Sequence, residues 1–447
     1  MNSRKLPTSH EDGDSPLATT DQAEMERTAL RLLQRPDVKQ AYLEARNLFL
    51  ADPVATSPAG SQKLDQGVEE FVLAAIYDTI LRDVSKPRII WIESPPHSWF
   101  GHTIGGARYF SDNPDCPTRA ASLDPAGSYE IHGRAAGVRQ TALSFQLYHD
   151  NSYGLVIPGT PRSSSSHEEF DTASGGFFDE GLRVASDGSY TITLSPESAR
   201  SRDNHIQIQP DTCALLIRSV LTDWSTESPD WLEICRLDQS SKGEGQTDAN
   251  LAEQVIQRLR DDAPFWLRAN HFFWFDNPPN LLPTPQARGG GWGYSSFGNF
   301  RLGIGEVLLI TIHPMGAHYT GFVVTSPWSI SCEHIRQTGS LNSTQTHPNA
   351  DGSYTYVISP TDPGVANWLD TDGLDIGGYF LRWMKFPELP ASGDGLVREV
   401  KLLKLADLEQ MLPKDMPRLT PAQRAQELTA RTKAYERRLV HQPQRSV

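Results

Sequence analysis

The sequence predicts a mainly β protein with two tandem, related antiparallel β-sandwich domains of jelly-roll type and helices at the N-terminal and C-terminal ends. Three observations predict this fold. A ten-residue segment is repeated, short alternating apolar runs dominate residues 87–390, and long helical periodicity is confined to the two ends and one central segment. The 34 Gly and 32 Pro residues further indicate many turns.

The repeat is the most specific of these signals. DGSYTITLSP at 187–196 and DGSYTYVISP at 351–360 agree at seven of ten positions and lie 164 residues apart. The match continues downstream, where Asn204 corresponds to Asn367 and Arg218 to Arg382. An internal duplication explains this pattern, and duplicated sandwiches packed about a pseudo-twofold axis would bring matching positions together at a shared cleft.

Each half also contains an alternating segment on both sides of a four-residue loop with Gly in its third place. The loops are AAGV at 135–138 and PMGA at 314–317. A glycine there can take the left-handed conformation that closes a tight turn. We therefore expect one hairpin in each half, with one face buried and the other wet or facing a ligand.

Changes of pattern along the chain divide it into six segments. Polar residues open the chain, amphipathic periodicity follows, and the flexible DQSSKGEGQTD stretch separates the two halves. The expected segments are a disordered tail (1–20), a helical segment (21–86), a first sandwich (87–238), a linker and helix (239–264), a second sandwich (265–390) and C-terminal helices (391–447).

Composition excludes several classes of protein. A formal net charge of −14 opposes binding to a phosphate backbone, so we expect no nucleic-acid partner. The start of the chain has no apolar signal segment, and no run reaches the length of a membrane span, so we expect a cytoplasmic protein without membrane contact. The 4 Cys are widely spaced, which does not fit a disulfide framework. Nucleotide-binding and serine-hydrolase motifs are absent from the sequence.

Four sequence pieces resemble a bacterial family known as domain of unknown function 1214. They are DNPD at 112–115, SLN at 340–342, DPGVANWLDTDG at 362–373, and Arg382-Trp383. The resemblance implies a β-sandwich or jelly-roll fold and no settled activity. Relatives tend to have a small residue and then basic residues after NWLDT, whereas Asp372, Leu374 and Asp375 follow here.

The loop that contains NWLDTDG is the first candidate site. Asp370 and Asp372 lie beside Asn367 and Trp368 and just before the strand that carries Arg382. Carboxylates beside an aromatic ring suit polyol or sugar binding, and a carboxylate pair can act as acid and base. Asp, Asn and Gly are equally ordinary turn residues, and Arg382 could simply pair with Asp370.

Three further stretches are candidates. His313 and His318 would face each other across the expected hairpin and could share a metal, but a third ligand is not evident. The glycine-rich stretch around Trp292 could form a lid or a plain loop. The turn-rich stretch around Tyr109 could form a wall of the cleft or a surface connection.

We therefore expect a protein that binds, and as a hydrolase or lyase could transform, a small organic molecule or sugar in a cleft between the repeats. No cofactor or metal is expected; homo-oligomerisation and catalysis itself stay open. The alternative is a non-catalytic carbohydrate-binding or assembly module with an exposed aromatic strip. The expected acid and base residues are Asp370, Asp372 and His318, and the expected ligand contacts are Arg218, Arg382, Asn204, Asn367, Trp368, Trp292 and Tyr109.

Overall fold

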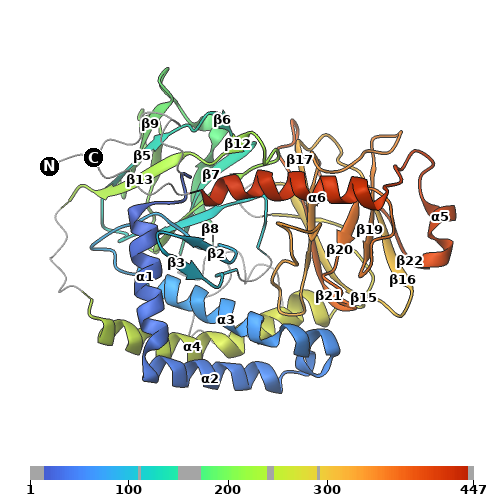
Figure 1. Ribbon diagram of the computed structural model, residues 1–447. Helices are drawn as coiled ribbons and strands as arrows, with labels where there is room; N and C mark the ends of the chain where they lie inside the picture. The colour runs from blue at the N-terminus through green and yellow to red at the C-terminus, as the bar shows by residue number, and fades with distance from the viewer. Residues whose placement is uncertain (1–14, 109–111, 150–172, 239–245, 289–291, 441–447) are drawn as a thin grey trace.

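The computed structural model describes residues 15–108, 112–149, 173–238, 246–288 and 292–440. Two β-sandwiches lie side by side above a layer of N-terminal helices, and one C-terminal helix runs across both (Figure 1). The prediction of a mainly β, duplicated sandwich fold with helices at both ends is confirmed.

The helices begin at conventional caps. Thr19, Ser57, Thr247 and Thr420 each accept a backbone N–H bond in the first turn, and α2, α3 and α6 have proline at the start. The helices are α1 (Thr20–Gln34), α2 (Pro36–Ala51), α3 (Pro58–Leu81), α4 (Asp248–Asn270), α5 (Leu408–Met411) and α6 (Pro421–Glu436). In the described ranges, none of them is apolar over enough length to cross a bilayer.

The first sandwich consists of a five-stranded and a four-stranded sheet. The five strands are, in spatial order, β1 (Ile90–Trp91), β4 (Thr118–Ser122), β11 (Ala214–Val220), β7 (Ala142–Tyr148) and β8 (Ala173–Phe178). The four are β10 (His205–Gln207), β9 (Ser189–Ser195), β5 (Tyr129–Arg134) and β13 (Trp231–Arg236). Alternate apolar residues of both sheets, among them Ile131, Phe145 and Ile217, form the core between them.

The second sandwich repeats this strand order. Its five-stranded sheet contains β14 (Gln286–Ala287), β15 (Tyr294–Arg301), β21 (Ile376–Met384), β17 (Tyr319–Thr325) and β18 (Ser340–Asn342). Its four-stranded sheet contains β20 (Trp368–Asp370), β19 (Tyr354–Ser359), β16 (Glu306–Ile312) and β22 (Val397–Lys404). In both halves the short edge strand, β10 or β20, pairs in parallel with its neighbour. The two halves therefore share one topology.

The prediction of one hairpin in each half, closed by the AAGV and PMGA loops, is wrong. β5 and β7 belong to different sheets of the first sandwich, and β16 and β17 belong to different sheets of the second. The loop glycines Gly137 and Gly316 do have positive φ values, of 58° and 88°. The turns nevertheless form arches between opposing sheets, because each strand finds its hydrogen-bond partners elsewhere. Two short pairs complete the strands: β2 (His97–Trp99) with β3 (His102–Ile104), and β6 (Val138–Arg139) with β12 (Glu227–Ser228).

Three segment boundaries also differ from expectation. Leu17 and Ala18 pack against Trp91 and Trp99, so the tail expected at 1–20 does not extend that far, and residues 1–14 lie outside the described ranges. Helix α4 continues into residues expected to begin the second sandwich. The C-terminal segment expected to be helical contains β22, which pairs with β16 and completes the second sandwich.

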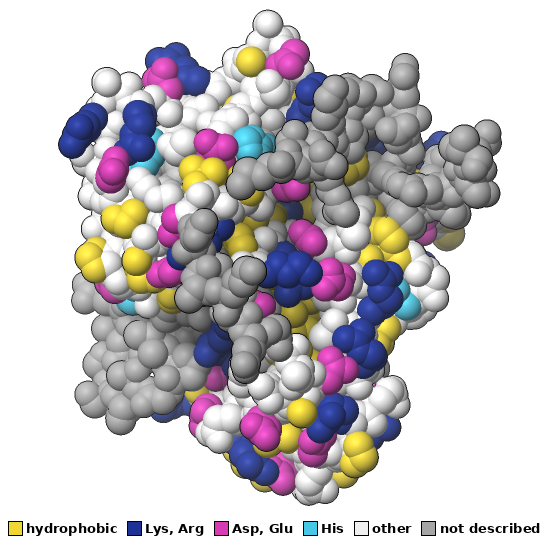
Figure 2. Space-filling view, turned by 90° about the vertical axis from the view of Figure 1, so that its left-hand side faces the viewer, with side chains coloured by type: hydrophobic (Ala, Val, Ile, Leu, Met, Phe, Trp, Pro, Cys, Tyr) yellow, Lys and Arg dark blue, Asp and Glu magenta, His cyan; other side chains and the backbone are white. Residues whose placement is uncertain are grey.

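Helix α6 and the helical turn that follows it (Arg437–Leu439) join the two sandwiches through buried arginines. Arg431 donates to the carbonyl of His334 in the second half, while Arg438 donates to the carbonyl of Pro114 in the first. On the face shown in Figure 2, acidic and basic side chains are interspersed among the described residues.

Candidate functional site

The outer faces of the two five-stranded sheets meet at a seam. Val220 of β11 and Met384 of β21, which are 164 residues apart, pack into one apolar cluster with Trp292. Ala142 of β7 and Tyr319 of β17 belong to the same cluster. Corresponding positions of the two repeats therefore meet here, as expected of duplicated units packed about a pseudo-twofold axis.

Arg218 and Arg382 point into this seam from the central strands. Their neighbours Ile217 and Leu381 face the sandwich cores, so alternation along each strand turns the arginines outward. The residues that flank them in register are small: Ser144 and Thr118 beside Arg218, and Gly321 and Ser295 beside Arg382. Small neighbours leave space for both guanidinium groups.

The Trp292 ring brings a third arginine to the seam. The Arg218 guanidinium lies 5.4 Å from the Trp292 ring centroid, and the Arg288 guanidinium lies 5.8 Å from it. Arg218 also donates to Gln146 Oε1 (2.7 Å) and to the hydroxyl of Tyr148 (2.8 Å). These contacts hold Arg218 in one orientation. The Arg288 backbone donates to the Gly293 carbonyl, which fixes where this side chain begins beside the seam.

Among the described residues, three arginines and two carboxyl groups, Glu93 and Asp112, contribute charge at the seam. Burial lowers the pKa of Arg288 to about 10, and the charges of Arg382 and Arg218 lower it further. Burial raises the pKa of Glu93 to about 7, against the opposing effects of Thr118 and of the charges of Arg218 and Arg382. Arg218 and Arg382 act on Glu93, which is only partly ionised at neutral pH, and Arg288 lies within electrostatic range of both arginines. Asp112 acts on both Glu93 and Arg382.

Sequence reasoning found two of these charged groups. Arg218 and Arg382 were expected because they occupy matching positions in the repeat. Glu93 and Arg288 were missed, since neither belongs to the repeated segments. An acidic residue directly after a short buried strand was the signal for Glu93, and a cation beside the Gly-rich stretch was the signal for Arg288.

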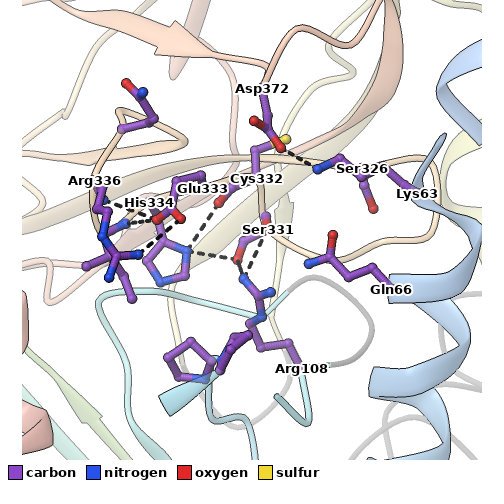
Figure 3. Close-up of a pocket in the computed structure, with 14 residues that line it drawn as sticks. Lys63, Gln66, Arg108, Ser326, Ser331, Cys332, Glu333, His334, Arg336 and Asp372 are labelled. Atoms are coloured by element: carbon purple, nitrogen blue, oxygen red, sulfur yellow. Dashed lines mark hydrogen bonds and ion pairs between the residues drawn. The ribbon is translucent and has the colours of Figure 1, made fainter. Parts of the chain in front are cut away.

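A separate polar pocket of about 450 Å³ lies between α3, the turn before Arg108, and loops of the second sandwich. Figure 3 shows Lys63 paired with Asp372 at one side of it and Arg108 bonded to Ser331 at the other. Arg108 is also held by a two-pronged ion pair with Glu70 of α3 (2.6 Å). The cations and carboxylates of this pocket mostly neutralise one another.

Ser331 and His334 in this pocket do not form a nucleophile and base. The Ser331 hydroxyl donates to Asp112 Oδ2 (2.7 Å). His334 Nδ1 lies 3.2 Å from the carbonyl of Cys332, an acceptor, so this nitrogen carries the hydrogen and also faces the Ser331 oxygen at 3.0 Å. Burial and neighbouring arginines lower the pKa of His334. The imidazole therefore donates to Ser331 and cannot take its proton.

The expected acid and base residues are not brought together. The Asp370 amide bonds to the carbonyl of Thr338, near the C-terminal end of β17, whereas His318 precedes the N-terminal end of that strand. A strand of 7 residues spans roughly 20 Å. Burial raises the pKa of Asp370 to about 6, but its carboxylate accepts the Asp372 amide within the turn (2.9 Å). His313 likewise accepts the amide of Met315 in its own loop.

The other side chains predicted to contact a ligand make hydrogen bonds and packing contacts within the fold instead. Asn204 and Asn367 bond the backbones of Arg183 and His347, each inside its own sandwich. Trp368 is 6% exposed and lies beneath the guanidinium of Arg424, with its indole bonded to the Ser359 carbonyl. Tyr109 lies outside the described residues.

Comparison with known proteins finds a similar family and a similar fold, and neither carries a known activity. The family model "Protein of unknown function (DUF1214)" matches residues 107–222 and 329–383, one segment in each sandwich. An uncharacterized protein from Burkholderia cenocepacia has a similar fold, with 22% identity, a TM-score of 0.66, and coverage of 85% of this chain and 99% of that chain. The VPA0106 protein from Vibrio parahaemolyticus gives 10% identity, a TM-score of 0.39, and coverage of 76% and 99%.

No curated protein matches the chain. Arg218 and Arg382 lie inside the two matched segments, as do the DNPD and NWLDT pieces that carried the resemblance in the sequence. The match to the DUF1214 model, a family of unknown function, confirms the predicted family resemblance.

Proposed function

We propose that this protein binds a small organic anion, with a carboxylate or phosphate group, at the seam between its two sandwiches. One observation supports the proposal: Arg288 lies within electrostatic range of Arg218 and Arg382, while the opposing carboxyl groups are Asp112 and the partly ionised Glu93, so the described groups at the seam are more cationic than anionic. Clustering positive charges away from water is costly, and an anionic ligand would offset that cost. Arginine forks also match the geometry of carboxylate and phosphate.

The negative net charge of the chain makes the excess of positive charge at the seam stand out. At −14, the whole molecule repels anions, so affinity for one would have to come from a built site. Trp292 fits such a site as an apolar wall against which the guanidinium groups of Arg218 and Arg288 lie. Hydrolase-type or lyase-type chemistry, if the ligand is transformed, would depend on Glu93, because a carboxyl pKa near neutrality suits proton transfer.

The carbohydrate-binding alternative receives less support. An exposed aromatic strip is the usual surface of such a module, whereas Trp292 is 4% exposed and Trp368 is 6% exposed. Neutral sugars would also add no negative charge to the arginine cluster. This alternative therefore serves as the competing outcome of the test below.

The test is calorimetric titration of the purified protein with succinate, citrate and glucose 6-phosphate, and with glucose as the neutral probe. Arg382→Gln, which removes one seam charge, should weaken binding of the preferred anion at least about tenfold, since a charge-assisted hydrogen bond contributes about 1.5–3 kcal/mol. The control is Arg398→Gln, whose arginine pairs with Asp351 at the surface. Absence of anion binding, or equal binding by Arg382→Gln, would contradict the proposal; preference for glucose would favour the alternative.

A further inference from the structure

A group of potential metal ligands lies on the outer face of the first sandwich, in the sheet that does not form the seam. Glu130 and His132 belong to β5, and Cys235 belongs to the neighbouring strand β13. One ligand atom from each of the three side chains lies within 4.8 Å of the others. Imidazole, thiolate and carboxylate are the donor types that Zn²⁺ accepts together.

The strand register explains why the three side chains meet. Cys235 lies directly opposite Glu130, and Glu233 lies directly opposite His132. Ile131 and Ile234 between them face the core, so all four polar residues share the outer face. Sequence spacing could not reveal this group, because its two strands are about 100 residues apart.

The distances fit the edges of a zinc coordination tetrahedron. His132 Nε2 lies 3.3 Å from Glu130 Oε2 and 3.7 Å from Cys235 Sγ. Ordinary Zn–N, Zn–O and Zn–S bonds at tetrahedral angles give N–O edges of about 3.3 Å and N–S edges of about 3.6 Å. Little movement of these side chains would be needed to enclose one ion.

His132 is also supported by a neighbouring strand. Its Nδ1 lies 3.4 Å from the hydroxyl of Thr191 on β9. A second hydrogen bond of this kind orients a ligating imidazole and directs the other ring nitrogen toward the metal. In this arrangement Nε2, which faces Glu130 and Cys235, is the ligating atom.

We propose that Glu130, His132 and Cys235 bind a zinc ion that joins β5 to β13. The fourth position would be filled by water or by Glu233. Because the ion binds the folded sheet, zinc would stabilise the first sandwich. Burial and the charges of Glu130 and Glu233 raise the pKa of Cys235, so zinc must displace the thiol proton when it binds. The facing residues of β9, Thr191 and Thr193, are uncharged.

The test is titration of the metal-free, reduced protein with Co²⁺ as a spectroscopic probe, followed by Zn²⁺. We expect saturable binding of one equivalent with a thiolate-to-cobalt absorption band, which Zn²⁺ removes. Cys235→Ser should abolish the band, and the matched control Cys213→Ser should retain it, because Cys213 is a half-buried thiol outside the group. Thr191→Val should weaken zinc binding roughly tenfold, as expected for an outer hydrogen-bond partner.

Failure to bind Co²⁺, or a band unchanged in Cys235→Ser, would overturn the proposal. If Cys235→Ser does not fold, as judged by circular dichroism, His132→Gln replaces it, and unchanged metal binding by that variant would have the same meaning. Mg²⁺, which prefers an all-oxygen shell, serves as the negative control and should not compete. These outcomes do not depend on the anion proposed at the seam.

Discussion

Asn204 and Asn367 hold the same left-handed corner in the two sandwiches. Their φ values are 48° and 56°, and each precedes the short strand that pairs in parallel with its neighbour. Each amide side chain bonds both the N–H and the C=O of one loop residue, Arg183 or His347. Asn is one of the few residues that tolerate this conformation. The matching asparagines are therefore a structural legacy of the duplication.

Replacement of the two asparagines should have unequal effects. Asn367 is 3% exposed and donates an additional bond to the Thr355 carbonyl, whereas Asn204 is half-buried. We expect Asn367→Ala to lower the free energy of unfolding by about 3 kcal/mol and Asn204→Ala by about 1–2 kcal/mol. Urea denaturation measures both. Asn367→Gly, which relieves the backbone strain, should lose about 1 kcal/mol less than Asn367→Ala. Equal losses at both positions would contradict this account.

The repeat predicted more of the fold than the strand patterns did. Because DGSYTITLSP and DGSYTYVISP start the same strand in each half, the duplication correctly predicted two sandwiches of one topology. Alternation within a strand reveals its two faces but not its partner, so an arch between sheets looked like a hairpin. Strand β22 (VREVKLLK) is hard to recognise from sequence because its charged residues do not follow the period of two that marks a half-buried strand.

The repeat also limits how much of the candidate site can be predicted from the sequence. Arg218 and Arg382 could be paired in advance because the duplication relates them. Glu93, Arg288 and the residues Glu130, His132 and Cys235 can be singled out by type, but their proximity depends on tertiary contacts between unrelated segments, which one sequence does not reveal. Asp370 and His318 lie near opposite ends of β17, a separation that their residue types and motifs could not reveal.

Trp292 is expected to hold the two sandwiches together. It is 4% exposed within the seam cluster, and Phe178 of β8 contacts its ring edge at 5.1 Å between centroids. Trp292→Ala should lower the free energy of unfolding by about 3–5 kcal/mol, the usual cost of deleting a buried aromatic side chain. Trp292→Phe should cost much less, because the indole N–H has no hydrogen-bond partner among the described residues. Thermal unfolding measures the difference.

The control for Trp292 is Leu402→Ala. Leu402 is 43% exposed, so its truncation should change stability by no more than about 0.5 kcal/mol. A Trp292→Ala variant as stable as Leu402→Ala would show that the seam cluster contributes little to the cohesion of the two halves.

Glu93 should make stability fall as the pH rises. Burial raises its pKa to about 7, above the ordinary carboxyl value of 4.5, so the folded protein binds more protons than the unfolded chain between these values. The contribution of Glu93 to the free energy of unfolding is therefore fully present below about pH 4.5 and is lost as the pH rises through about 7. Glu93→Gln should remove this slope. The difference in free energy of unfolding between wild type and variant, measured from pH 5 to pH 8, tests it; a constant difference would contradict it.

The ionisation of Glu93 should also affect the affinity of the seam for an anion. Ionised Glu93 competes with a ligand anion for the arginines, so affinity should be higher at pH 6 than at pH 8 in the wild type. In Glu93→Gln the affinity should be nearly independent of pH in this range. A higher affinity for the anion at pH 8 than at pH 6 would mean that the anion binds away from Glu93.

The buried pair of Arg108 and Glu70 should show strong coupling. Arg108 is 5% exposed, Glu70 is fully buried, and two guanidinium nitrogens meet the carboxylate at 2.6 Å and 2.9 Å. Burial raises the pKa of Glu70 even with Arg108 beside it, so removal of the arginine leaves a carboxylate that must take up a proton. Arg108→Met should therefore cost about 3–5 kcal/mol of unfolding free energy.

Removal of both partners should be less harmful than removal of the arginine alone. Buried ion pairs replaced by apolar side chains of similar size are often neutral in stability, so Arg108→Met with Glu70→Leu should recover much of the loss. Recovery will be incomplete because Arg108 also donates to the carbonyl of Ser331 in the second sandwich (3.2 Å). Denaturation of both single variants and the double variant gives the coupling energy. A double variant no more stable than Arg108→Met would mean that Arg108 acts through Ser331 and not through Glu70.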